Sequence, residues 1–214
     1  MATQFLAITT RLVAHDAYDE TRECLASDWG ALFANEDLFA PFLPLVVSYE
    51  IPFEHYVPFV SGVILSGGND LAACNDNPLS QKRDVYERGI IETAIAQKLP
   101  VLGICRGAQY LGQHFGASLI PCVGHIGEHK VSVGAQHFVV NSFHNYALST
   151  LAAPLAPLAS AQDCTIEAFA HSELPLFGMM WHIEREEKLC NLSREIVGNF
   201  LQKCRDFAGI SADL

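Results

Sequence analysis

The sequence predicts an α/β protein whose mostly parallel central sheet is flanked by helices. Short apolar segments alternate with longer amphipathic ones through the first half of the chain, as in parallel strands joined by crossover helices. One predicted strand, Leu99–Ile104, runs into a cysteine and then a helix almost without a break. Gly103 and Gly107 flank Cys105 and allow a sharp backbone turn there. A strand, a cysteine and a helix in this order are the layout of a nucleophile elbow.

The elements of the first half follow from their hydrophobic periodicity. Predicted strands are Phe5–Thr9, Pro44–Tyr49, Val63–Leu65 and Leu99–Ile104. Predicted helices are Thr21–Phe33, with Leu25, Trp29 and Leu32 on one face, Ser80–Gln97 and Gln109–Phe115.

The pattern changes after Gly116, where helical periodicity fades and β-branched segments appear. We expect further, partly antiparallel strands here, followed by a closing helix and a frayed tail. The strands are Phe138–Val140, Thr165–Phe169 and Phe177–Trp181, the helix is Asn191–Arg205, and the tail is Gly209–Leu214.

Composition narrows the class of protein. The 214 residues fit a single domain, 1–214, with 50% hydrophobic residues to fill its core. A net charge of −11 argues against nucleic acid or an anionic membrane as the main partner. Seven cysteines without a CxxC pair indicate free thiols in the cytoplasm. The sequence does not fix the oligomeric state, and a homo-oligomer is compatible with it.

Three polar segments follow predicted strands and are therefore expected at one edge of the sheet. They are Ser66–Asp70, Cys105–Gly107 and His182–Glu184. A helix N-terminus favours the thiolate of Cys105. An extended His-x-Glu would place His182 on that thiol and Glu184 behind it. N–H groups of the glycine turn and of Arg106 would then form an oxyanion hole.

Each segment alone has a simpler interpretation. Cys105 could be a buried core thiol, His182 and Glu184 two polar residues at a strand end, and Gly67-Gly68 an ordinary turn. Their co-occurrence in this order favours the catalytic hypothesis.

The motifs GICRGAQ, LSGGND and WHIE together resemble the class I glutamine amidotransferase fold, which is flavodoxin-like and carries a Cys-His-Glu triad. The resemblance spans nearly the whole chain. Within that superfamily, the segments Arg83–Glu87, Asn141–His144 and Thr165–Ala168 resemble the stand-alone γ-glutamyl hydrolases of the peptidase C26 type.

The resemblance implies hydrolysis of a γ-glutamyl amide through a thioester on Cys105, with His182 and Glu184 completing the triad. Gly68 and Arg106 are the implied oxyanion donors. The branch it most resembles acts on a γ-glutamyl nucleotide, releasing glutamate and cytidine diphosphoramidate for the phosphoramidate decoration of bacterial capsules. The implied substrate-binding residues are Asn69, Gln109, Ser142, Phe143, His144 and Arg11.

Contacts to a diphosphate require cations, because the protein as a whole is acidic. Arg11 is the best placed, just past the first strand. The other candidates are Lys82, Arg83, His129 and Lys130.

Two departures from the broader family concern the substrate. Ile183 stands where proline is usual between the triad histidine and glutamate, and Asn145-Tyr146 follow His144 in place of His-Gln. The alternatives are a hydrolase of other γ-glutamyl amines, the glutaminase subunit of an amidotransferase, and a non-catalytic binding protein of the same fold.

The segment His125-Ile126-Gly127-Glu128-His129 matches the H-x-x-E-H pattern of zinc peptidases. That site needs a helix, which Pro121, Gly124 and Gly127 disfavour. We therefore expect a loop over the active site. Thiol acyl transfer requires no metal and no organic cofactor, so none is predicted.

Overall fold

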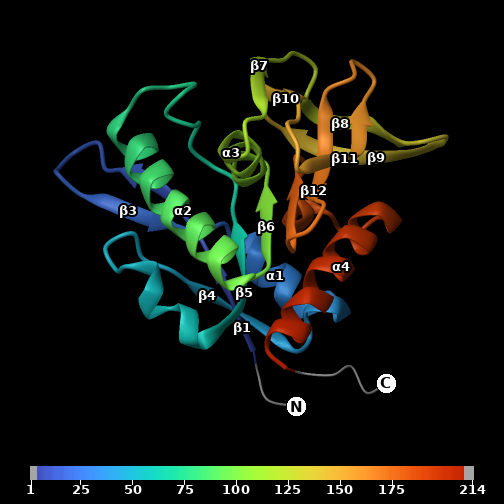
Figure 1. The fold of residues 1–214 in the computed structure, drawn as a ribbon. Helices are drawn as coiled ribbons and strands as arrows, with labels where there is room; N and C mark the ends of the chain where they lie inside the picture. Colours follow the sequence, from blue (N-terminus) through green and yellow to red (C-terminus); the bar gives the residue numbers. More distant parts are fainter. Residues whose placement is uncertain (1–3, 210–214) are drawn as a thin grey trace.

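The computed structural model describes residues 4–209, in which eleven strands form one mixed sheet. Its order is β4-β1-β5-β6-β13-β12-β11-β8-β9, and β10 joins β12 to β7 (Figure 1). The α/β prediction is confirmed. The first five strands in this order pair in parallel. The remaining pairings are antiparallel and more extensive than a mostly parallel sheet implies.

The parallel half of the sheet contains β4 (Phe42–Val46), β1 (Gln4–Ile8), β5 (Val60–Leu65), β6 (Val101–Ile104) and β13 (Leu176–Met179). The antiparallel half contains β12 (Ile166–His171), β11 (Leu155–Ala161), β8 (Ile126–Val133), β9 (Gln136–Phe143), β10 (Tyr146–Thr150) and β7 (Ser118–Pro121). A separate hairpin pairs β2 (Arg11–Ala14) with β3 (Thr21–Cys24).

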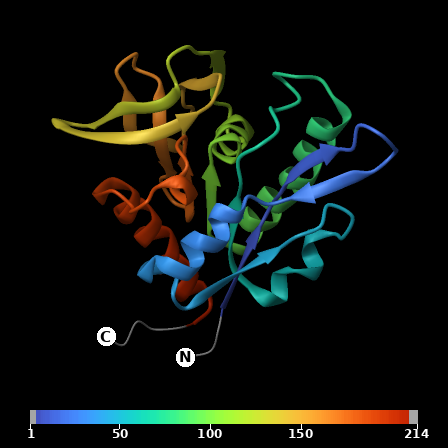
Figure 2. The same ribbon diagram turned by 180° about the vertical axis from the view of Figure 1, so that it is seen from behind.

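Helices cover both faces of the parallel half, as the two views in Figures 1 and 2 show. On one face, α1 (Ser27–Asn35) and α4 (Asn191–Phe207) pack on Leu6 and Ile8 of β1. Ala7, between them, faces α2 (Pro78–Gln97) and α3 (Arg106–His114). Because both faces are buried, these strands are apolar throughout rather than alternating, which is why they stand out in the sequence.

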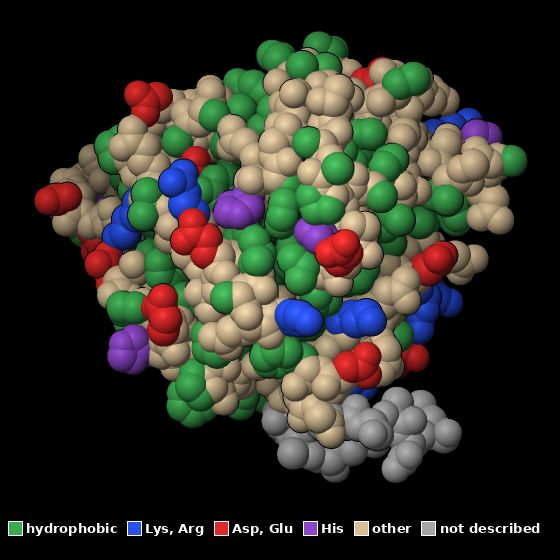
Figure 3. Space-filling model, viewed as in Figure 1, with side chains coloured by type: hydrophobic (Ala, Val, Ile, Leu, Met, Phe, Trp, Pro, Cys, Tyr) green, Lys and Arg blue, Asp and Glu red, His purple; other side chains and the backbone are tan. Residues whose placement is uncertain are grey.

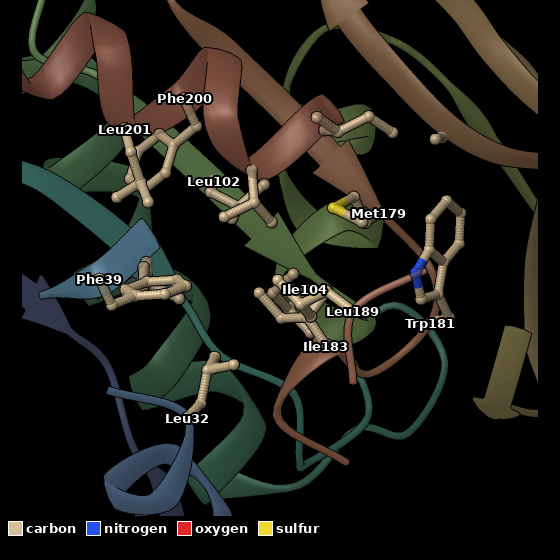
Figure 4. Close-up of a cluster of buried hydrophobic side chains, with 14 of the residues drawn as sticks. Leu32, Phe39, Leu102, Ile104, Met179, Trp181, Ile183, Leu189, Phe200 and Leu201 are labelled. Atoms are coloured by element: carbon tan, nitrogen blue, oxygen red, sulfur yellow. The ribbon is translucent and has the colours of Figure 1, made fainter. Parts of the chain in front are cut away.

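The core on the α1 and α4 side extends to the loop after β13. Phe200 and Leu201 of α4 lie over Leu102, Ile183 and Leu189 lie near Ile104, and Trp181 lies beyond Met179 in the same core (Figure 4). This core supports the segment that carries His182 and Glu184.

One predicted helix is partly wrong. Thr21–Cys24 is strand β3, and Leu25 precedes the helix, which begins at Ser27. The hairpin prevails because Glu23 accepts hydrogen bonds from Ser48 Oγ and Tyr49 N at 3.0 and 2.9 Å. The other predicted elements exist with shifted ends; of the predicted tail, residues 210–214 lie outside the described range.

The surface seen in Figure 3 carries scattered acidic and basic side chains among hydrophobic and uncharged ones. Within residues 4–209, no helix is long and apolar enough to cross a membrane.

Candidate active site

Cys105 sits between β6 and α3 in a strained turn. Its φ and ψ are 51° and −108°, a conformation that non-glycine residues rarely adopt. The turn is tight because α3 starts directly against β5: a Cβ on Gly107 would lie 2.0 Å from the carbonyl oxygen of Leu65. Only glycine fits there. The predicted nucleophile elbow is confirmed as backbone geometry, and it holds Cys105 at the N-terminus of α3.

His182 and Glu184 lie beside this cysteine. His182 Nδ1 is 2.6 Å from Glu184 Oε1, and both side chains are buried. A Cβ added to Gly67 would lie 2.9 Å from His182 Cε1 and 3.6 Å from Cys105 Cβ. The side chains of His182 and Cys105 therefore both pack against this glycine. Burial would lower the pKa of His182, but its contacts with Cys105 and Glu184 outweigh burial and raise the pKa to about 9.

The backbone brings His182 and Glu184 together by a route the sequence did not predict. The predicted strand Phe177–Trp181 ends at Met179, and Glu184 lies in a 3₁₀ turn, Ile183–Arg185, instead of an extended segment. The loop that follows β13 is fixed by a buried chain of hydrogen bonds, in which Trp181 Nε1 donates to Ser193 Oγ at 2.9 Å and Ser193 Oγ donates to Glu186 Oε1 at 2.6 Å.

The glycine turn after β5 forms the other wall. Gly68 has a φ of 129°, which favours glycine. Arg83, from α2, donates to Ser66 O at 2.7 Å and to Gly67 O at 2.9 Å. Because Arg83 donates to both carbonyl oxygens, it fixes the orientation of the peptide groups in this turn. Arg106 is the first residue of α3, so its N–H has no intrahelical partner.

Arg83 belongs to a buried ionic network instead of to a phosphate site. It pairs with Glu87 at 2.9 Å, and Glu87 and Asp84 both pair with Arg106. Burial and the charge of Arg83 lower the pKa of Arg106 to about 9, against the opposing effect of Asp84. The prediction that Arg83 could meet a diphosphate is therefore wrong, because its guanidinium is fully buried among internal partners.

The other predicted cations lie in three different settings. Lys82 pairs with Glu50 at the surface. His129 lies in a buried cluster, and Lys130 is exposed on β8. Arg11 lines a cavity of about 300 Å³ together with Gly67, Gly68 and His182. A Cβ on Gly68 would lie 3.1 Å from Arg11 Cβ, so the stem of Arg11 crosses the glycine turn.

The same cavity contains Arg185, which sequence analysis missed. Its guanidinium lies 4.6 Å from the ring centroid of Phe143, and that ring in turn packs edge-on against His182 at 5.8 Å. Arg185 immediately follows Glu184, so its position after the His-x-Glu pair was the signal that could have found it.

The remaining predicted substrate residues are divided. Phe143 faces His182. Gln109 donates to Tyr146 O at 2.8 Å, and Asn69 is bonded through both its amide atoms to the backbone of Leu12. The described contacts of Asn69 and Gln109 thus hold neighbouring segments in place. Ser142 Oγ and His144 instead face a histidine–glutamate cluster on the antiparallel half of the sheet.

Asn141 is a further residue of the site that sequence reasoning did not single out. Its Oδ1 accepts from His182 N at 3.0 Å, and its Nδ2 donates to His182 O at 3.0 Å. The side chain therefore binds both sides of the His182 peptide unit from β9.

Comparisons with known proteins agree with this geometry. A family model described as Peptidase C26 matches residues 6–135 and 127–184. The chain belongs to the peptidase C26 family. Solved structures also share the fold: a Thermoplasma acidophilum protein superposes with a TM-score of 0.72 at 21% identity, covering 98% of both chains. A glutamine amidotransferase from Thermotoga maritima superposes with a TM-score of 0.61 at 18% identity, covering 99% of this chain and all of that one.

Among characterised relatives of this peptidase C26 protein, the γ-glutamyl-CDP-amidate hydrolase of Campylobacter jejuni is 52% identical over 188 residues. The match covers 88% of this chain and 94% of that protein. A glutamine-hydrolysing GMP synthase component from Thermoplasma volcanium is 28% identical, with 68% of this chain and 72% of that protein covered.

Proposed function

We propose that this protein hydrolyses γ-glutamyl-CDP-amidate to glutamate and cytidine diphosphoramidate. The observation that carries the proposal is the 52% identity to a γ-glutamyl-CDP-amidate hydrolase across almost the full length of both chains. We place the reaction in the cytoplasm, because the seven free cysteines fit a reducing compartment.

The triad supplies the chemistry. The Cys105 thiolate attacks the γ-carbonyl carbon, and N–H groups of Gly68 and Arg106 stabilise the oxyanion. His182 gives its proton to the leaving nitrogen, so the C–N bond breaks and a glutamyl thioester remains on Cys105. His182 then takes a proton from water, which attacks the thioester and releases glutamate. Glu184, 2.6 Å from His182 Nδ1, orients the ring and stabilises its charged form.

Two cavities adjoin the triad, and the charges of their linings indicate which one binds the leaving group. Arg11 and Arg185 line the cavity at His182 and suit the diphosphate of the leaving group. A larger hollow of about 820 Å³ lies between α1 and the loop after β13, and its lining is net acidic: the carboxylates of Glu36, Asp37, Glu184, Glu186 and Glu187 outnumber the cations Lys188 and Arg194. Such a lining repels a diphosphate, so we assign the substrate to the smaller cavity.

A direct competition tests the proposal. Purified enzyme receives γ-glutamyl-CDP-amidate, γ-glutamyl-aminobutyrate and glutamine at equal concentrations, and product formation is followed separately for each. We expect a preference for the nucleotide of at least ~100-fold in kcat/KM, because binding of the remote diphosphate positions the reacting carbonyl. A preference for γ-glutamyl-aminobutyrate would indicate a general γ-glutamyl amine hydrolase, and a preference for glutamine would indicate an amidotransferase subunit.

The two arginines provide a sharper version of this test. Arg11→Ala and Arg185→Ala should each lower kcat/KM for the nucleotide by ~10- to 100-fold, since a hydrogen bond to a charged group contributes about 1.5–3 kcal/mol. Hydrolysis of glutamine should change little in Arg11→Ala, and in Arg185→Ala it should fall less than hydrolysis of the nucleotide, since Arg185 Nε also lies 4.0 Å from Glu184 Oε1. Lys188→Ala is the matched control, because Lys188 lines the acidic hollow instead. Equal losses on both substrates would place the arginines in the scaffold.

A further inference from the structure

A buried cluster of metal-ligating side chains lies on the antiparallel half of the sheet. It contains His125, which directly precedes β8, His129 on β8 and Glu167 on β12. His125 and Glu167 are 4% and 0% exposed, and the side chain of His129 is 13% exposed. One ligand atom from each of the three lies within 4.8 Å of the other two. This cluster is separate from the Cys105 triad.

Histidine nitrogens of the cluster converge on the Glu167 carboxylate at 3.0–3.7 Å, but they are poorly aligned for hydrogen bonds. Among the residues the structure describes, buried atoms without an aligned hydrogen-bond partner include His125 Nδ1, His144 Nε2 and both carboxylate oxygens of Glu167. A buried carboxylate without a well-aligned donor is costly, and native proteins rarely leave one in this state. A bound cation would satisfy His125 Nδ1 and the carboxylate at once.

The distances from the histidine nitrogens to the Glu167 carboxylate suit ligands of one small ion. His125 Nδ1 is 3.0 Å from Glu167 Oε1, His129 Nε2 is 3.4 Å from Glu167 Oε2, and His144 Nε2 is 3.7 Å from Glu167 Oε1. Zinc bonds of about 2.0–2.2 Å in tetrahedral geometry place neighbouring ligand atoms roughly 3.4 Å apart.

A second carboxylate orients one of the histidines. His125 turns its other ring nitrogen, Nε2, towards Asp163 Oδ2 at 3.0 Å. Asp163 is itself held by Thr165, whose N and Oγ1 donate to Asp163 Oδ1 at 3.1 and 2.7 Å. A histidine held by a carboxylate on one nitrogen while the other faces the ion is the usual outer-shell arrangement of zinc ligands.

We propose that His125, His129 and Glu167 bind a zinc ion. The ligands come from the segment His125–His129, at the start of β8, and from β12, so the ion links two strands that β11 separates in the sheet. Its role is structural, because it joins strands of the antiparallel half outside the Cys105 triad, and water completes its tetrahedral shell.

This inference differs from the expectation that the chain holds no metal. That expectation rejected His125 and His129 because they are not on a helix. The segment is not regularly extended either: Gly127, between the two histidines, has a φ of 98°, and the ring centroids of His125 and His129 lie 4.7 Å apart.

Metal content tests the proposal. Tag-free protein is stripped with a chelator, given zinc, dialysed, and analysed for bound metal by mass spectrometry. The wild type should retain about one zinc per chain, and zinc should raise its Tm. His129→Gln and Glu167→Gln should retain less than a tenth of this zinc and show no Tm shift. His137→Gln is the control, since His137 is an exposed histidine on β9.

Two further proteins keep the outcome decisive. Cys105→Ala should retain zinc, because the triad is not the proposed site. Wild-type protein loaded with Co²⁺ should show tetrahedral visible bands without a thiolate-to-cobalt charge-transfer band. The proposal is overturned if stripped wild-type protein takes up no zinc, if the Glu167 and His129 variants bind it like the wild type, or if binding needs Cys105. A thiolate band would also overturn this ligand set.

Discussion

At the scale of single residues, Cys105 combines a positive φ with a buried position at the N-terminus of α3, whereas Cys164, which also has a positive φ, is exposed. A positive φ at a non-glycine residue costs on the order of 1–3 kcal/mol and persists only where the surroundings impose it. Here β6, α3 and the Gly107 contact impose it. Cys204, by contrast, is buried in the core, and burial raises the pKa of its thiol well above the ordinary value. Geometry and environment together support the proposal that Cys105 is the nucleophile.

Replacing Cys105 should therefore remove activity without unfolding the protein. Cys105→Ala should lower kcat by ~10³-fold or more, because the members of a triad act as a unit. The far-ultraviolet circular dichroism and Tm should stay near those of the wild type. Cys24→Ala and Cys74→Ala are controls that should keep nearly full activity. Near-native turnover by the Cys105 variant would rule out the thioester mechanism.

The raised pKa of His182 predicts a pH-dependent contribution to stability. With a folded-state pKa of about 9, against 6.5 for an ordinary histidine, His182 stabilises the folded state fully below pH 6.5. This contribution is lost as the pH rises through about 9. The difference in unfolding free energy between the wild type and His182→Asn should therefore shrink from pH 6.5 to pH 9.5.

Urea unfolding at several pH values measures this difference. Groups away from His182 contribute equally to both proteins and cancel in the difference. In Glu184→Gln, the unfolding free energy should depend on pH less than in the wild type and more than in His182→Asn. The reason is that this variant removes one of the two contacts that raise the pKa of His182. A difference that is constant with pH would contradict the contact of His182 with Cys105.

At the scale of elements, sequence reasoning succeeded where strands are buried on both faces. Val63–Leu65 of β5 and Val101–Ile104 of β6 are apolar runs, and the polar segments after such strands predicted the triad and the glycine turn. It failed where strands have an exposed face: β7 and β11 contain proline, serine and alanine, and only their neighbours make them strands. The zinc cluster and Asn141 depend on those pairings, so the sequence alone could not show them.

At the same scale, the ionic network of Arg83 and Glu87 on α2 holds the glycine turn after β5 in place. Arg83→Met should destabilise the protein by about 3–5 kcal/mol, because buried Glu87 loses one of its two cationic partners and keeps only Arg106. The variant should also lose kcat, since the carbonyl oxygens of Ser66 and Gly67 lose their donor. Urea denaturation and steady-state kinetics measure the two effects.

Controls separate the network from general damage to α2. Lys82→Met, at a neighbouring surface ion pair, should change stability by less than about 1 kcal/mol. Arg83→Met combined with Glu87→Met should regain much of the lost stability while kcat stays low. Recovery of both quantities would show that Arg83 does not position the turn.

At the scale of the whole molecule, the active site lies where the two halves of the sheet meet. Cys105 and the glycine turn follow parallel strands, while β13, which leads to His182, pairs with β6 on one side and antiparallel β12 on the other. The backbone of Glu167 accepts from Met180 N at 2.8 Å, only two residues before His182. The antiparallel half therefore sets the position of the catalytic base.

Asn141 gives this relation its clearest test, because it is the side chain of β9 that binds the His182 peptide unit. Asn141→Ala should lower kcat by ~10- to 100-fold, since a shift of about 1 Å in a catalytic group has an effect of that size. KM should change little, and alkylation of Cys105 by iodoacetamide should slow. Asn145→Ala, an exposed asparagine after the same strand, is the matched control. If Asn141→Ala raised KM and left kcat intact, β9 would contact the substrate directly and would not position His182.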